Sequence, residues 1–151
     1  MNFLAHLLLS GDDEDIIFGN FIGDAVKGKQ YTRFPERVAQ GILLHRHIDH
    51  FADSHPYALE CRRILAEDLG HYAPVALDLV FDHLLARDWE EWNDMELEAF
   101  CEDKHQILSD RIGEMPPETA YLFRAMVRGE WLKNYARREG VYRSLRGLGS
   151  R

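Results

Sequence analysis

The sequence contains only two cysteines, Cys61 and Cys101, among its 151 residues. Neither belongs to a CxxC pair, and two cysteines are too few for a disulfide framework. Reduced thiols are typical of proteins in the cytoplasm. We therefore predict a cytoplasmic protein without structural disulfides.

Long apolar runs are also missing. The opening segment 1–10 is apolar but short, carries His6 in its middle and runs into an acidic stretch at 12–15. A membrane span needs about 20 apolar residues, and a secretory signal begins with positive charge. The segment is therefore predicted to be a buried helix, and we expect no membrane partner.

Positive charge is scarce through most of the chain, whose formal net charge is −8. Residues 1–120 carry 10 Lys or Arg against 24 Asp or Glu, whereas residues 121–151 carry 8 against 2. A dedicated nucleic-acid binder needs a positive contact face, so we predict no nucleic-acid partner. The basic end could receive an acidic protein, or it could be a solvated helix face.

No alternating apolar and polar run indicates a strand, and apolar residues recur at helical spacing almost throughout. The pattern predicts an all-α fold of seven or eight helices. Ser54 is a plausible N-cap, and Pro56 and Pro74 suit first helical turns. Breaks are expected at 10–11, 27–29, 53–56, Gly70, 93–94, 113–117 and Gly140. Because there is no repeat or linker, we predict one domain over 1–151.

Polar residues interrupt the apolar helix predicted over 16–26. Asn20 and Asp24 are four residues apart and share a face, as do Gly19 and Gly23. Each interior glycine costs a helix roughly 1 kcal/mol relative to alanine. Either tight helix packing or room for a ligand beside Asp24 would explain two of them.

A second helix, predicted over 38–53, places His45, Asp49 and Asp53 one turn apart. Nitrogen and oxygen ligands at this spacing can converge on one cation. Any one of them alone is more simply a surface residue or part of an ion pair. Three in register on an apolar helix favour a metal site.

A third helix, predicted over 75–85, carries Asp78, Asp82 and His83. An unpaired buried carboxylate costs several kcal/mol, so these acids must be paired, hydrogen-bonded, protonated or bound to a metal. The alternative is that Asp78 and Asp82 line a solvent-facing edge. His6 adds a candidate from a fourth helix.

A bundle of these four helices would gather imidazoles and carboxylates around one pocket: His6, Asp24, His45, Asp49, Asp82 and His83. Such mixed ligands suit Mn²⁺, Fe²⁺ or Zn²⁺ better than Mg²⁺, which prefers oxygen. The residues alone therefore indicate a metal hydrolase and do not show which bond it cuts.

Several short motifs in order along the chain resemble one known family. They are residues 1–7, 19–24 with 26–28, 41–42, 44–46, 48–49, Asp53, Pro56, Asp78, 81–85, Trp89, 131–132 and Tyr135. Together they are similar to the acyl carrier protein phosphodiesterases, a family whose fold is thought to be related to the HD-type metal phosphohydrolases. The likeness spans almost the whole chain, although family members usually continue for a further helix.

The resemblance implies hydrolysis of the phosphodiester that joins 4′-phosphopantetheine to the serine of holo acyl carrier protein, with a divalent metal, usually Mn²⁺. It implies Asp24, His45 and Asp82 as catalytic residues, and Asp24, His45, Asp49, Asp82 and His83 as metal ligands. Supporting positions around the metal would be His6, Asn20, Asp53 and Asp78. Lys27 and Arg46 would contact phosphate, and Arg137 and Arg138 would meet the acidic carrier.

Two other functions fit the same residues. An HD-like hydrolase of nucleotides or other small phosphoesters would use the same pocket. A non-catalytic helical module would instead present the acidic stripes as solvated faces.

Overall fold

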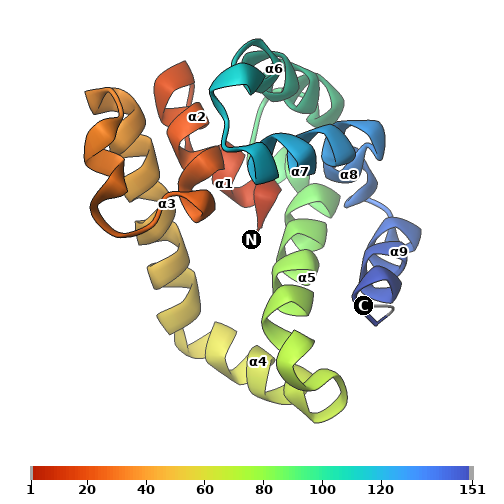
Figure 1. Cartoon of the computed structure of the whole chain (residues 1–151). Coiled ribbons are helices and arrows are strands. Elements are labelled where there is room, and N and C mark those ends of the chain that lie inside the picture. The colour runs from red at the N-terminus through yellow and green to blue at the C-terminus, as the bar shows by residue number, and fades with distance from the viewer. Residues whose placement is uncertain (1, 150–151) are drawn as a thin grey trace.

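The computed structural model describes residues 2–149, with side chains up to residue 146, and this range contains helices and turns but no strand. The prediction of an all-α fold is confirmed (Figure 1). Nine α-helices are present in the described range. The first five are α1 Phe3–Leu9, α2 Glu14–Ile22, α3 Glu36–Ser54, α4 Pro56–Leu69 and α5 Ala73–Arg87. The others are α6 Leu97–Asp110, α7 Pro117–Arg128, α8 Trp131–Asn134 and α9 Arg138–Gly149.

Short 3-10 turns connect several of these helices: η1 Gly23–Ala25, η2 Gly28–Arg33, η3 Gly70–Tyr72, η4 Trp89–Glu91 and η5 Ile112–Glu114. The end residues of the predicted domain, 1 and 150–151, lie outside the described residues. No helix within 2–149 is both long enough and apolar enough to cross a membrane.

Most expected helix breaks coincide with observed ones, but the described range holds nine α-helices rather than seven or eight, because an unexpected break separates α7 from α8. Two further details were wrong. The cap of α4 is His55 and not Ser54, because the His55 ring accepts a hydrogen bond from the Tyr57 N–H at 3.3 Å. Gly140 does not end a helix but lies inside α9. Pro56 and Pro74 do occupy first turns, where the missing N–H has no helical acceptor to lose.

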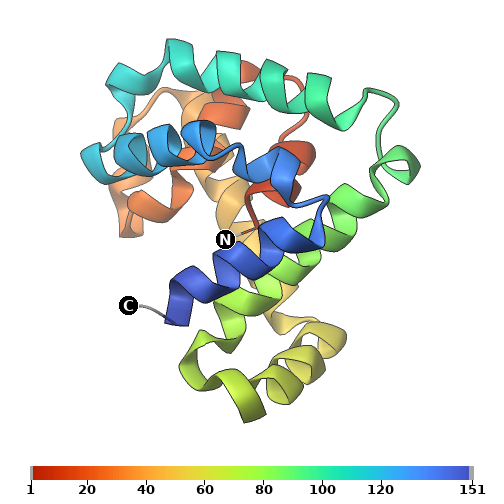
Figure 2. The same ribbon diagram turned by 90° about the vertical axis from the view of Figure 1, so that its right-hand side faces the viewer.

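The main core lies among α1, α2, the first half of α3, and α6 to α8. Its most deeply buried side chains include Leu4, Ile17, Phe18, Ile22, Ile42, Leu108, Phe123, Met126 and Leu132. The second half of α3, α4 and the first half of α5 form an arm that extends away from this core (Figures 1 and 2). α5 then returns to pack against α1 and α9.

Helices α2 and α3 cross at two glycines with their backbones in contact. A Cβ atom on Gly19 would lie 2.1 Å from the carbonyl oxygen of Val38, and one on Gly41 would lie 2.4 Å from that of Ile16. Neither position has room for a side chain. This approach brings Asn20 of α2 next to His45 of α3, as described below, so the crossing positions the candidate site.

We expect Gly19→Ala to lower the free energy of unfolding by about 2 kcal/mol or more, because a close helix crossing has no volume for a methyl group. Gly113→Ala is the matched control. A Cβ atom there meets nothing within 4 Å, so we expect a change of less than about 0.5 kcal/mol. Chemical denaturation measures both, and equal losses would contradict the crossing.

Candidate metal and active site

Three residues from two helices bring ligand atoms together at the edge of the core. His6 of α1 and His45 and Asp49 of α3 each offer an atom within 4.8 Å of the others. The two imidazoles are 2% exposed and stack with their ring centroids 4.4 Å apart. The Asp49 side chain is 39% exposed, so the group opens to solvent on the carboxylate side.

The amide of Asn20 holds both imidazoles. Its oxygen lies 2.7 Å from Nδ1 of His6 and 3.2 Å from Nδ1 of His45. Its Nδ2 donates to the His6 carbonyl at 3.0 Å and to the Ser10 hydroxyl at 2.8 Å, which orients the amide. Because an amide oxygen only accepts hydrogen bonds, both Nδ1 atoms carry hydrogen.

The other nitrogen of each imidazole faces a carboxylate. Nε2 of His6 lies 3.0 Å from Oδ1 of Asp49, and Nε2 of His45 lies 3.1 Å from its Oδ2. In a neutral imidazole with hydrogen on Nδ1, Nε2 carries a lone pair, which a carboxylate oxygen repels. Something positive must therefore sit between each ring and Asp49, either a proton or a metal cation.

Ionisation of the metal-free site follows from these contacts. Burial alone would lower the pKa of His45, but hydrogen bonds to Asp24 and Asp49 outweigh it and raise that pKa to about 9. For Asp49, burial acts to raise the pKa, yet hydrogen bonds to His45 and His6 bring it well below the usual range. The group therefore holds a positively charged His45 against an ionised Asp49.

The same donors fit a divalent cation. Two imidazole nitrogens and a carboxylate are a ligand set found around Mn²⁺, Fe²⁺ and Zn²⁺. The hydrogen bonds from Nδ1 to Asn20 fix the ring orientation and leave Nε2 free to coordinate, as supporting hydrogen bonds do in known metal sites.

Asp24 lies beside the group, in η1 rather than on the end of α2. Its Oδ1 is 3.3 Å from Nε2 of His45, and this hydrogen bond lowers its pKa. The side chain is 59% exposed. Gly23 makes the room, since a Cβ there would lie 2.4 Å from Cγ of His45. The two glycines of this segment are thus required for different reasons: Gly19 allows close helix packing, and Gly23 leaves space for an imidazole.

Asp82 of α5 has a different environment from the one expected of a metal ligand. It is 1% exposed, and its two oxygens accept hydrogen bonds from the N–H groups of Leu4 at 2.9 Å and Ala5 at 3.1 Å. Asn2, at the start of α1, makes no capping hydrogen bond with its side chain. Asp82 therefore caps α1 from a distant part of the chain and so holds His6 in place.

Other predicted site residues also lie outside the three-residue group. Nδ1 of His83 is 2.6 Å from the carbonyl oxygen of Tyr135, which ties α5 to the end of α8. Asp53 forms an ion pair with Arg62 of α4. Asp78 lies near enough to Asp82 to contribute to the rise in its pKa. The structure thus places His6 in the three-residue group and Asp82 and His83 outside it.

The basic residues predicted to contact phosphate or the carrier lie in two places. Arg46 follows His45 on α3, donates to the Val26 carbonyl at 2.8 Å and lies over the Tyr31 ring at 5.4 Å. Lys27 is exposed just after η1. Arg137 and Arg138 are exposed where α8 gives way to α9, and α9 lies on the other side of the molecule from the upper part of α3 (Figure 1).

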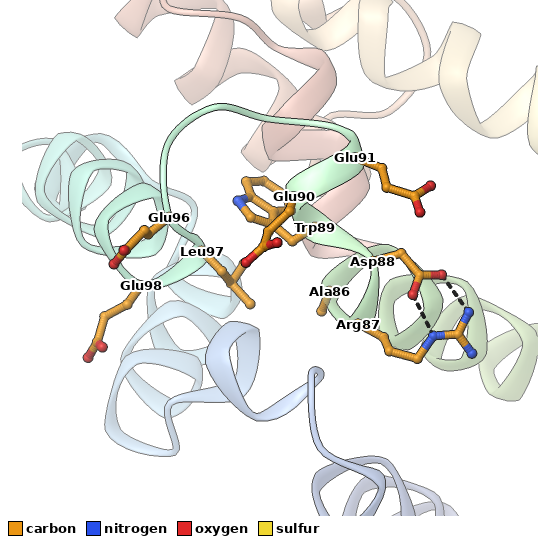
Figure 3. A pocket seen from close by; sticks show the side chains of 9 residues that line it. All are labelled: Ala86, Arg87, Asp88, Trp89, Glu90, Glu91, Glu96, Leu97 and Glu98. Carbon is orange, nitrogen blue, oxygen red and sulfur yellow. Dashed lines mark hydrogen bonds and ion pairs between the residues drawn. The ribbon is translucent and has the colours of Figure 1, made fainter.

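A hollow elsewhere in the described structure contains none of these residues. It has a volume of about 500 Å³ and lies where α5, η4 and the start of α6 meet (Figure 3). Glutamates dominate its lining, namely Glu90, Glu91, Glu96 and Glu98, and Arg87 on its border is paired with Asp88. An acidic hollow of this kind would repel a phosphate ester, so it is not the candidate site.

Comparison with known proteins identifies relatives over the full chain. The family described as acyl carrier protein phosphodiesterase matches residues 1–151. Proteins named acyl carrier protein phosphodiesterase from Salmonella paratyphi A and Salmonella dublin are 33% and 32% identical to the chain over 152 residues. Each alignment covers 100% of this chain and 79% of the relative. No solved structure matches.

Fold and site together define an all-helical protein whose buried imidazoles and carboxylate can hold a divalent cation. Within that class, the full-length match and the identity above 30% are decisive. The chain belongs to the acyl carrier protein phosphodiesterase family, as the motifs of its sequence predicted.

We expect Asp82→Ala to lower the free energy of unfolding by about 1–3 kcal/mol, because it leaves two buried N–H groups of α1 without an acceptor. Burial, reinforced by Asp78, raises the Asp82 pKa to about 7, whereas its two hydrogen bonds to the backbone act to lower it. Since this pKa exceeds the ordinary 3.8, the carboxyl should destabilise the folded protein progressively as pH rises from about 4 to 7.

Asp82→Asn, which does not titrate, should therefore gain stability relative to the wild type over that pH range. Denaturation curves of both proteins between pH 4 and 7.5 measure the difference. A difference that does not change with pH would show that Asp82 is ionised throughout.

Proposed function

We propose that this protein hydrolyses the phosphodiester linking 4′-phosphopantetheine to a serine of acyl carrier protein. The observation that carries the proposal is the group formed by His6, His45 and Asp49, with both Nε2 atoms directed at one carboxylate. The name shared by the family and its Salmonella members supports the choice of substrate. Water adds to phosphorus, the serine oxygen leaves with a proton, and apo carrier protein and free 4′-phosphopantetheine result.

We further propose that His6, His45 and Asp49 hold the metal, with Mn²⁺ as the preferred ion, and that Asp24 is close enough to join them. A bound divalent cation would act as a Lewis acid and lower the pKa of water to near neutrality. Asp82 and His83 stay predictions as ligands, although their hydrogen bonds favour supporting roles.

Residues around the group would supply the remaining chemistry. Asp24 is ionised and exposed, so it can accept a proton or hydrogen bond from the attacking water. Lys27 and Arg46 are the nearest basic residues in sequence to Asp24 and His45, and they would offset the negative charge of the phosphodiester. Arg137 and Arg138 are a second basic candidate for contact with the carrier. A cytoplasmic location would suit this substrate and the two free cysteines.

We expect His6→Asn and His45→Asn each to weaken Mn²⁺ binding by more than about 100-fold, because each removes a metal ligand. Loss of a hydrogen bond that only supports a ligand has a smaller effect. His83→Asn is the matched control and should change affinity by less than about tenfold. Isothermal titration of proteins verified as folded by circular dichroism measures this. Strong loss with His83→Asn and none with His6→Asn would restore His83 as the ligand.

Incubation of holo acyl carrier protein with the enzyme and Mn²⁺ should convert it to the apo form, because the bond to serine is hydrolysed. Mass spectrometry of the carrier measures the loss, and His45→Asn provides the inactive control. If the carrier is unchanged while nucleotides or other small phosphoesters are hydrolysed, the enzyme is a small-molecule phosphohydrolase instead.

A further inference from the structure

Most basic side chains in the acidic part of the protein are neutralised by a carboxylate. The ion pairs in the described structure involve Arg37, Arg62, Arg63, Arg87, Lys104 and Arg111, and also Lys133 nearer the end. Among residues 2–120, the basic side chains without any carboxylate partner are Lys27, Lys29, Arg33 and Arg46. All four belong to one region of the fold.

That region comprises the turn η2, Lys27 just before it, and Arg46 on α3, the helix against which η2 packs. Residues 25–35 contain no acidic residue, in a part of the chain where acids outnumber bases more than two to one. Lys27, Lys29 and Arg33 are exposed. Arg46 connects this turn to the site, because it contacts Val26 and Tyr31 on one side and follows His45 on the other.

The proposed reaction places a strict demand on where the carrier docks. Only the Cβ and Oγ atoms of the serine separate the phosphorus from the main chain of the carrier. The carrier surface must therefore lie against the protein surface at His6, His45 and Asp49 when its phosphodiester reaches them. A charged docking surface can serve this reaction only if it borders the site.

We propose that Lys27, Lys29 and Arg33, here called the η2 rim, form the docking surface for an acidic protein that presents the serine-linked phosphodiester. This inference rests on the proposed function and specifies where its protein substrate binds. Exposed cations without internal partners attract an acidic surface at long range and fix its orientation on contact. They also offset the repulsion between that surface and the exposed carboxylates Asp24 and Asp49.

The basic C-terminal surface is less suited to this task. Among the described residues, Arg137 and Arg138 also have no ion pair. They lie by α9, which packs on α5 and α8, whereas η2 lies against α3. Figure 1 places the segment between α2 and α3 on the opposite side of the molecule from α9. A carrier held at Arg137 would not bring its serine to His45 by the same contact.

The test compares two charge reversals of equal size. Lys29→Glu/Arg33→Glu changes the rim without touching Lys27 or Arg46, and Arg137→Glu/Arg138→Glu changes the C-terminal surface. Fluorescence anisotropy of labelled holo carrier protein, with EDTA present to prevent turnover, measures binding at low salt. Rates with Mn²⁺ on holo carrier and on bis(p-nitrophenyl) phosphate measure the reaction.

We expect the rim variant to weaken carrier binding by about tenfold or more, with a difference that shrinks as salt screens the charges. Its rate on the small phosphodiester should stay within about twofold of the wild type, because Lys29 and Arg33 do not contact the imidazole–carboxylate group. The C-terminal variant should change carrier binding by less than about threefold.

Three results would overturn the inference. Greater loss of carrier binding in the C-terminal variant would move the docking surface to α9. Unchanged carrier binding in the rim variant would remove the rim from docking. If the rim variant no longer binds an oligonucleotide that the wild type binds, while its carrier binding is unaffected, the rim is a nucleic-acid surface.

If the proposed function is wrong, the experiments give a different result. A wild-type enzyme that leaves the holo carrier intact refutes the proposed hydrolysis, whatever the two variants do. The anisotropy measurement still decides whether the rim binds the acidic protein, because it requires no turnover.

Discussion

One amide oxygen organises the candidate site. The Asn20 Oδ1 atom accepts from Nδ1 of both His6 and His45, and its Nδ2 is held by the His6 carbonyl and by Ser10. With both Nδ1 atoms occupied, the two Nε2 atoms are left to face carboxylates, and both face Asp49. A buried amide thus determines which ring nitrogen is available for a cation, and the proposed chemistry depends on that choice.

The rest of the fold supplies the rigid support that this arrangement needs. The glycine crossing of α2 and α3 brings Asn20 within reach of His45, and Gly23 leaves space for the imidazole. Asp82 secures α1, the short helix that carries His6. A helix of seven residues has little stability of its own, so its position must come from tertiary contacts. A supporting residue such as Asp82 can therefore matter as much as a ligand.

Charge is distributed in relation to this site. Ion pairs neutralise most basic side chains of the acidic body, and the exceptions gather at η2 and Arg46, next to Asp24 and His45. Negative charge over most of the surface would repel an acidic protein. The η2 rim gives such a partner one place near the imidazoles where approach is favourable.

The sequence by itself determined the helical class, the family, and the alignment of His45 with Asp49, because helical periodicity and local motifs depend only on residues close in the chain. It also indicated that buried acids on α5 would need partners. Only the tertiary structure decided which partners they have. Asp82 meets backbone N–H groups 77 and 78 residues away, His83 meets a carbonyl 52 residues away, and His6 meets Asp49 43 residues away. Such contacts depend on how helices pack in three dimensions, which residue spacing within any single helix does not encode.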